Sequence, residues 1–169
     1  MLKRAKRLKP TIEKWCIRNN ETRFQLSDDE WKHIAYILCL TKPFFVFTKI
    51  LSETKDVTIH RVFDIYNTLF THIDNAIEKL KAKEAPWKKD VVRALYKGQS
   101  KLRQYYSNTR YPHGDIYAIG TILAPCHKLE FFSGEDWADL DWASKYRESL
   151  RDQFNVYRAQ LEKSEISPK

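Results

Sequence analysis

Two clusters of carboxylates are the residues of this sequence best suited to chemistry. The acids of the first are consecutive and those of the second are interleaved with two tryptophans: Asp28, Asp29 and Glu30, then Asp136, Asp139 and Asp141. Carboxylates that hold paired metal ions can stabilise the attacking and leaving oxygens of a phosphoryl transfer. Consecutive residues on a helix point in different directions, however, so the first trio is poorly placed to share one ion.

Helix capping explains both clusters better. Ser27 and Glu30 form the Ser-x-x-Glu pattern of a capping box, and the apolar Trp31 follows at once. The acids of that first turn would also face the positive end of the helix dipole. We interpret the second cluster in the same way, as the cap of the final helix with its two tryptophans packed. The sequence therefore assigns no catalytic residue.

The histidines and cysteines are spaced in a way that predicts no metal site. The chain has five His and three Cys, and no CxxC or CxxxC pair occurs. His60 and His72 are twelve residues apart, which is too far for the i, i+4 ligand pair of a helix. Cys126 and His127 are adjacent, so their side chains are expected to diverge. The chain also lacks a Gly-rich phosphate loop and a GxSxG nucleophile motif, and no cofactor is expected.

A row of cations is the constellation that looks most functional. Lys89, Arg93, Lys97 and Lys101 follow one another at steps of four, which places them on one face of a helix. Each cation could neutralise one phosphate, giving salt-sensitive DNA binding that does not read base sequence. The nearby tyrosines are candidates for stacking on bases, although helical spacing places Tyr105 in the core: Tyr105, Tyr106 and Tyr111. The alternative is that these cations only solvate a helix face.

The overall charge agrees with a polyanionic partner. The formal net charge is +8 and the isoelectric point is about 9.3. Residues 1–19 carry seven Lys and Arg, including Lys3, Arg4 and Arg7, against one acid, whereas residues from 130 onward carry nine acids and six bases. DNA is therefore a candidate partner of the N-terminal region as well as of the cationic row.

The elements that must position these residues are predicted to be helices. Four Gly and six Pro are few for the turns of a many-stranded fold. Apolar residues recur at helical spacing through 57–83, 87–106 and 139–163, and Thr41-Lys42-Pro43 is expected to interrupt the helix that begins after Ser27. Pro10 should start or kink a helix. Segment 115–124 is apolar almost throughout, so periodicity leaves it open between a strand and a short buried helix.

We therefore predict an all-α fold, a single bundle of about six helices over residues 1–164, with a disordered tail at 165–169. The 57–83 and 87–106 helices should form its central antiparallel pair. No run of eighteen apolar residues and no secretory signal are found, so a soluble intracellular protein with no membrane partner is expected.

Several segments in order resemble one family. LSDDEW (26–31), TKPF (41–44), VTIHRVFDIYNTLF (57–70), KLRQYYSNT (101–109) and YAIGTILAPCHKLEFF (117–132) are similar to the hAT superfamily of DNA transposases, particularly fungal ones. The likeness extends over about residues 1–160. Its individual motifs are loose, but their order is specific.

The resemblance implies that the chain lies in the helical insertion of an RNase H-like catalytic core. In that family an Asp, Asp and Glu triad does the chemistry, and all three would lie outside residues 1–169. No catalytic residue can be carried over, and no BED-type zinc finger is present. The resemblance also implies that segment 117–124 is helical.

Three functions follow as expectations. The first is a nuclear, non-catalytic transposase fragment or remnant that contacts the DNA backbone or partner helices. The second is a domesticated helical protein-interaction module that does not bind DNA. The third, an active nuclease or transposase, would need carboxylates from another chain. Self-association is also expected, because Leu8, Ile12 and Trp15 would be exposed where a missing core once covered them.

Overall fold

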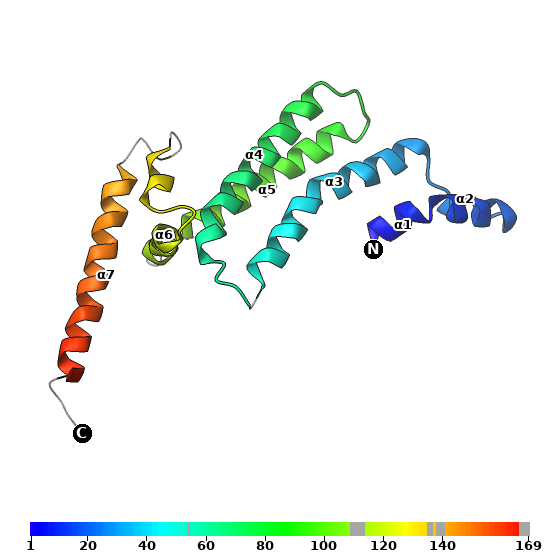
Figure 1. Cartoon of the computed structure of the whole chain (residues 1–169). Coiled ribbons are helices and arrows are strands. Elements are labelled where there is room, and N and C mark those ends of the chain that lie inside the picture. Colours follow the sequence, from blue (N-terminus) through cyan, green and yellow to red (C-terminus); the bar gives the residue numbers. More distant parts are fainter. Residues whose placement is uncertain (54, 109–113, 135–136, 138–140, 166–169) are drawn as a thin grey trace. The chain divides into compact units, whose positions relative to one another are not determined.

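A computed structural model describes residues 1–53, 55–108, 114–134, 137 and 141–165. The prediction of an all-α fold is confirmed, since the described residues form helices and no strand (Figure 1). The α-helices are α1 (Leu2–Arg7), α2 (Lys9–Arg18), α3 (Asp28–Leu51), α4 (Val62–Lys81), α5 (Lys88–Asn108), α6 (Gly114–Leu123) and α7 (Trp142–Glu165). Short 3₁₀ helices accompany them, among them η1 (Thr22–Phe24), η2 (Ile59–Arg61) and η3 (Leu129–Ser133).

The chain divides into two compact units, and the boundaries fall within α4 and α5. Unit 1 comprises Met1–Ile50 and Asn67–Lys101, and unit 2 comprises Leu51–Tyr66 and Leu102–Lys169. The prediction of a single bundle over residues 1–164 does not separate these two units. Of the tail 165–169, Glu165 ends α7, and the rest lies outside the described residues.

Unit 1 begins with two short helices that meet at Leu8. Pro10 lies in the first turn of α2, as predicted, where its missing N–H costs nothing because the first N–H groups of a helix have no helical acceptor. Leu8 adopts φ −91° and ψ 6°, and its N–H closes α1 on the carbonyl of Arg4. The junction before Pro10 therefore separates α1 from α2.

Helix α3 begins at the predicted capping box. The backbone N–H of Ser27 donates to Oε2 of Glu30 at 2.8 Å, and the N–H of Glu30 donates to Oγ of Ser27 at 3.3 Å. These two bonds satisfy N–H groups that have no acceptor inside the helix. Both bonds join Ser27 and Glu30, so the capping box predicted from the sequence is confirmed.

The prediction that Thr41-Lys42-Pro43 interrupts this helix is wrong. Helix α3 continues through Pro43 to Leu51. Pro43 has no N–H to donate to the carbonyl of Cys39, one turn earlier, but two side chains make further hydrogen bonds in this part of the helix. The hydroxyl of Thr41 donates to the carbonyl of Ile37 at 2.9 Å, and the ring of His72 on α4 donates from Nε2 to the carbonyl of Leu40 at 3.1 Å.

The parts of α4 and α5 in unit 1 run antiparallel, as predicted. The amide of Gln99 donates to the carboxylate of Asp74 at 2.5 Å, and Tyr36 of α3 donates to the carbonyl of Ala76 at 3.3 Å. The buried stripe consists of α4 residues together with Val91 of α5: Leu69, Ile73, Ala76, Ile77 and Leu80. Predicted helix 57–83 thus corresponds to η2 followed by α4, and the stripe read from its periodicity is the core of this unit.

Unit 2 is built around a cluster of aromatic rings. Phe63, Phe132, Trp137 and Tyr146 are buried together with Ala118. The rings of Phe63 and Trp137 meet edge to face with centroids 5.2 Å apart, and those of Phe132 and Trp137 do so at 5.0 Å. Edge-to-face geometry is favoured because the positive rim of one ring faces the negative face of the other.

Helix α6 ends at Leu123, so the helix that the family resemblance implied for 117–124 is confirmed except at Ala124. Helix α6 packs on η2, and the hydroxyl of Thr121 donates to the carbonyls of Tyr117 at 2.8 Å and His60 at 3.5 Å. Helix α7 begins after Asp141, whose carboxylate accepts from the N–H of Ser144 at 3.4 Å. The capping role predicted for Asp141 is therefore confirmed, while Asp136 and Asp139 lie outside the described residues.

One stretch, Thr22–Leu51, is long and apolar enough to cross a membrane by length and composition alone. The core helices of soluble proteins pass the same test. Most residues of α3 are exposed or half-buried, and the helix contacts α4 through Tyr36 and His72. No second helix among the described residues has this length and composition.

Candidate nucleic-acid interface

The cationic ridge, which we define as Lys89, Arg93, Lys97 and Lys101, lies on the exposed face of α5. All four residues are exposed, and all four belong to unit 1. The buried residues of the same stretch, Val91 and Gln99, face the other side of the helix. Steps of four residues advance about 6 Å along a helix, so the ridge is about 18 Å long. Its outward placement agrees with the helical spacing.

The packed side of α5 fixes the direction of the ridge. Val91 belongs to the apolar core, and the amide of the buried Gln99 is held by Asp74 on α4. Because these two contacts lie two turns apart, rotation of α5 about its axis would break both. The ridge therefore projects from a helix of set orientation.

Local charges modify the ridge unevenly. Nη2 of Arg93 lies 3.2 Å from Oδ1 of Asp90, one turn earlier on the helix. Both side chains are largely exposed, so this ion pair contributes little to stability and a phosphate could replace the carboxylate. Lys88, just before the ridge, donates to the carbonyl of Lys81 at 2.8 Å and so joins the end of α4 to the start of α5.

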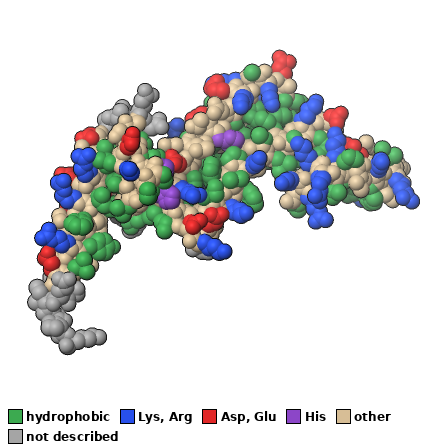
Figure 2. All heavy atoms as spheres, viewed as in Figure 1, with side chains coloured by type: hydrophobic (Ala, Val, Ile, Leu, Met, Phe, Trp, Pro, Cys, Tyr) green, Lys and Arg blue, Asp and Glu red, His purple; other side chains and the backbone are tan. Residues whose placement is uncertain are grey.

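The second group of predicted DNA-binding residues lies on α1. Lys3, Arg4 and Arg7 are exposed there, and the helix has no buried residue. Lys and Arg side chains gather over α1 and α2 on the face drawn in Figure 2. The structure thus places the predicted cations on two different helices of unit 1. Of the tyrosines considered for stacking, Tyr105 is exposed and Tyr106 packs on the core of unit 2, while Tyr111 lies outside the described residues.

The first carboxylate cluster is occupied by local contacts. Asp28 accepts from Nζ of Lys9 at 3.0 Å, and Asp29 pairs with Lys32 at 3.0 Å. The hydrogen bond from Lys9 lowers the pKa of Asp28, and the same contact raises the pKa of Lys9. The backbone N–H of Ser27 lowers the pKa of Glu30. Each acid therefore has a structural partner, in agreement with the capping interpretation.

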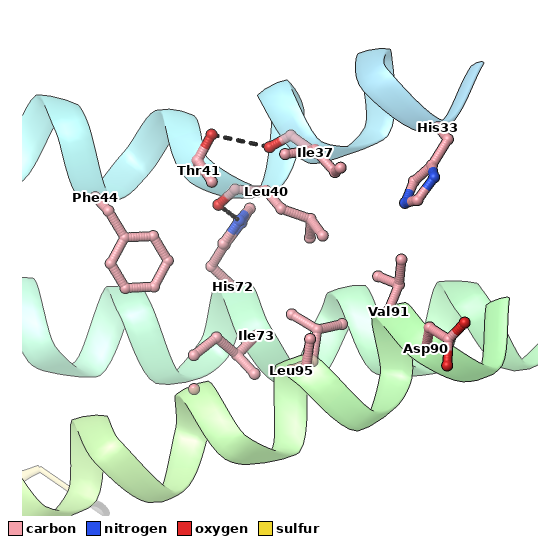
Figure 3. A pocket seen from close by; sticks show the side chains of 12 residues that line it. His33, Ile37, Leu40, Thr41, Phe44, His72, Ile73, Asp90, Val91 and Leu95 are labelled. Carbon is pink, nitrogen blue, oxygen red and sulfur yellow. Dashed lines mark hydrogen bonds between the residues drawn. The ribbon is translucent and has the colours of Figure 1, made fainter. Parts of the chain in front are cut away.

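An apolar pocket in unit 1 was not found by sequence reasoning. Its volume is about 390 Å³, and α3, α4 and α5 line it (Figure 3). Ile37, Leu40, Phe44, Val91 and Leu95 supply most of the wall. These residues are far apart in sequence. Helical spacing predicts which face of each helix is apolar, but it does not predict how completely the side chains of neighbouring helices fill the space between them.

Two histidines border this pocket, and both have structural partners. His72 donates to the carbonyl of Leu40, as Figure 3 shows. The ring of His33 stacks on that of Trp87 with centroids 4.9 Å apart and planes 2° apart. Both histidines therefore contact neighbouring segments and help to hold α3 in place.

A cluster of possible metal ligands in unit 2 was also missed. One ligand atom from each of His60, Cys126 and His127 lies within 4.8 Å of the others. The expectation that Cys126 and His127 diverge is wrong, because they lie in a tight turn after α6 and not in a regular element. A separation of 66 residues between His60 and Cys126 hides the cluster from any spacing rule.

Comparison with known proteins gives one informative relative. The chain is 42% identical over 157 residues to the protein named "Putative transcriptional regulator tpeD" from Talaromyces stipitatus. The alignment covers 93% of this chain and 16% of the relative, so the chain corresponds to a small part of that protein. No protein-family model matches the chain, and no solved structure matches it.

Proposed function

We propose that this chain is a non-catalytic, helical piece of a hAT-type transposase lineage that binds the phosphate backbone of DNA through the cationic ridge. The observation that carries the proposal is the placement of four cations on one exposed face, opposite the contacts of Val91 and Gln99 that hold the helix. Because contacts with α4 hold the helix, its cations can meet successive phosphates without a prior change in the backbone.

The length of the ridge matches a backbone contact better than base recognition. About 18 Å of helix can follow several phosphates of one strand. Three of the four ridge residues are lysines, which act on phosphates as point charges, and none of the four side chains offers an acceptor for the amino groups of adenine or cytosine. We therefore propose binding that depends on salt and not on sequence.

The relative supports a nuclear role in contact with DNA. Its printed name describes a transcriptional regulator, and almost the whole of the present chain aligns with it. We propose a nuclear location for this chain on that ground. The activity of the relative as a whole is a separate matter, because the alignment spans 16% of its length.

Absence of DNA cleavage by the isolated chain is also part of the proposal. A catalytic triad of this family needs three carboxylates. The consecutive acids Asp28, Asp29 and Glu30 each contact a neighbouring group instead: Lys9, Lys32 and Ser27. We expect no strand cleavage or joining by the pure chain with Mg²⁺ or Mn²⁺. Metal-dependent nicking that an Asp28→Asn variant loses would contradict this expectation.

A salt titration tests the binding proposal. Affinity for two duplexes of unrelated sequence would be measured by fluorescence anisotropy at several salt concentrations. Each neutralised phosphate contributes about −0.9 to the slope of log K against log salt, so contact by two to four cations predicts a slope of roughly −2 to −4. The two duplexes should give the same slope. Absence of binding at low salt would reject the proposal.

The apolar pocket favours a second candidate function, a protein-interaction module. A cavity of about 390 Å³ with an apolar wall could accept large side chains of a partner helix. Phe44 at its border and Phe45 beside it are both exposed. If the salt titration shows no DNA binding, this second function becomes the better explanation of the chain.

A further inference from the structure

Three side chains that commonly bind metals converge in unit 2. His60 lies in η2, whereas Cys126 and His127 lie in the turn after α6. A ring nitrogen of each histidine and Sγ of Cys126 all lie within 4.8 Å of one another. The two imidazole rings are 5.8 Å apart between centroids. None of the three residues belongs to the cationic ridge or to the apolar pocket.

Close packing of α6 against η2 produces this convergence. Gly120 has no side chain, which lets the backbone of α6 approach Ile59, next to His60. One residue later, Thr121 donates its hydroxyl to the carbonyl of His60 at 3.5 Å. These contacts hold the C-terminal end of α6 beside η2.

A tight turn then directs Cys126 and His127 back toward η2. The N–H groups of His127 and Lys128 both donate to the carbonyl of Ala124 at 3.1 Å. Lys128 adopts a φ of 54°, in the left-handed region that reverses the chain direction. The ring of His127 packs edge to face on Phe131 with centroids 5.2 Å apart, which fixes the histidine from its outer side.

Asp64 supplies a fourth group of suitable chemistry. It follows His60 by four residues, and its Oδ2 lies 3.5 Å from Nε2 of His127. Metal-bound histidines usually give their second ring N–H to a carboxylate, which sets the orientation of the ring. Asp64 therefore lies where a positioning residue for His127 would be needed.

The ligand set corresponds to the preferences of zinc. Zn²⁺ takes thiolate and imidazole ligands in tetrahedral geometry, with bonds of about 2.3 Å to sulfur and about 2.0 Å to nitrogen. Such bonds place two nitrogens, or a nitrogen and a sulfur, roughly 3.3–3.6 Å apart. Rotation of the side chains by about 1 Å would close the observed spacing to that range. Cys126 is exposed and His60 is half-buried, so these two side chains could move toward His127, which Phe131 and Asp64 contact.

We propose that His60, Cys126 and His127 bind a zinc ion that ties the turn after α6 to η2. Asp64 holds His127 in position, and the fourth coordination site is open to water. The ion would join two segments that are 66 residues apart in the sequence. The ion would be independent of the DNA contact proposed for α5, because none of its ligands lies on that helix.

Cobalt absorbance tests this proposal on the full chain. Co²⁺ titrated into the thiol-reduced protein should give visible bands of a tetrahedral site and a near-ultraviolet band from thiolate-to-metal charge transfer. Zn²⁺ added afterwards should abolish both sets of bands. The Cys126→Ser variant should lose the charge-transfer band, while Cys39→Ser should keep it, because Cys39 is equally exposed but lies on α3.

A second measurement separates the metal site from general folding. Zn²⁺ should raise the Tm of the natural chain but not those of the His60→Ala and Cys126→Ser variants, since only the folded natural chain holds all ligands. Asp64→Asn should weaken zinc binding by about 10–100-fold without removing the charge-transfer band. Circular dichroism should show unchanged helix content in each variant without metal.

The proposal is overturned if the natural chain gives no cobalt bands at micromolar protein and metal. It is also overturned if Cys126→Ser retains the charge-transfer band, or if Cys39→Ser loses it to the same extent. A rise in Tm with Zn²⁺ that persists in both His60→Ala and Cys126→Ser would place the ion elsewhere and equally reject the assigned ligands.

Discussion

Gly120 approaches Ile59 so closely that a β-carbon at position 120 would lie 2.5 Å from Cγ2 of Ile59. Real β-carbons do not come this close to another atom. Gly98, in contrast, is a helical glycine whose added β-carbon would meet nothing within 4 Å. The two glycines lie inside helices of the same chain, and only one of them is required by packing.

Gly120→Ala should destabilise the protein by about 1–3 kcal/mol. The clashing methyl group belongs to a β-branched side chain, which cannot move aside by a simple rotation. The gain of about 1 kcal/mol in helix propensity offsets only part of this cost. Chemical denaturation would measure the change. Adding Ile59→Ala should recover part of the loss, and a fully additive double variant would show that the contact is not the cause.

Gly98→Ala should stabilise the protein by about 1 kcal/mol, because alanine has the higher helix propensity and its methyl group enters open space. The same denaturation experiment measures it. Position 98 also borders the apolar pocket of unit 1, so the methyl group does not displace a packed neighbour. A loss of stability would mean that the pocket is narrower in solution than in this structure.

Reversing two charges of the cationic ridge should weaken DNA binding without changing the fold. In the Lys89→Glu/Lys97→Glu variant, two phosphate contacts become repulsive. Affinity for any duplex should fall at least about tenfold at low salt, and the salt slope should become shallower by about 2. Helix content measured by circular dichroism should stay the same, because both positions are exposed.

The matched control for the ridge is Lys42→Glu/Lys49→Glu on α3. It changes the net charge by the same amount, at exposed positions of the same unit. This control should retain most of the affinity. Equal weakening by both double variants would indicate attraction by overall charge, and the ridge would lose its assigned role.

The capping box predicts one contribution to the pH dependence of stability. The N–H of Ser27 holds the pKa of Glu30 below its ordinary value of 4.5. Because the folded chain binds this proton less tightly than the unfolded chain, the contribution is present above pH 4.5 and is lost as the pH falls through the lowered pKa. In the Glu30→Gln variant, stability should therefore decrease less between pH 6 and pH 3. Parallel curves for the two proteins would exclude the carboxylate as a source of the acid dependence.

Self-association is expected from the N-terminal helices. Trp15 is 51% exposed and Ile17 is 71% exposed, and α2 contributes only Cys16 to the buried residues. With Leu2 and Leu8, which are also exposed, these side chains give the N-terminal helices apolar surface that favours contact with a second copy. Sedimentation velocity should show association that rises with concentration and is reduced in a Trp15→Gln variant. A monomer at high concentration for the natural chain would contradict this prediction.

The sequence was informative wherever one local pattern decides the structure. The stripe from Leu69 to Leu80 predicted α4, and the Ser27 capping box predicted the start of α3, because both depend on residues within a few turns. The exposed side of α5 followed from the same helical spacing. The four residues of the cationic ridge could therefore be placed on one face of a helix from the sequence alone.

Features that depend on contacts between distant segments could not be predicted. A proline such as Pro43 predicts the end of a helix when only the local sequence is considered. Helix α3 nevertheless continues past Pro43, and His72 of α4 donates to the carbonyl of Leu40 beside it. Periodicity also left α6 open between helix and strand. The cluster of His60, Cys126 and His127 forms only because α6 packs on η2, and no spacing in the sequence records that contact.

Burial of one cysteine has a consequence for studying the motions of the chain. Cys16 is 2% exposed in α2, whereas Cys39 and Cys126 are exposed. A thiol reagent can therefore modify Cys16 only in molecules where α2 has moved away from its neighbours, while it reaches Cys39 without any such motion. The ratio of the two labelling rates, followed by mass spectrometry in native buffer, gives the equilibrium constant for this local opening. The natural chain thus contains both a reporter of helix detachment and the internal standard needed to calibrate it.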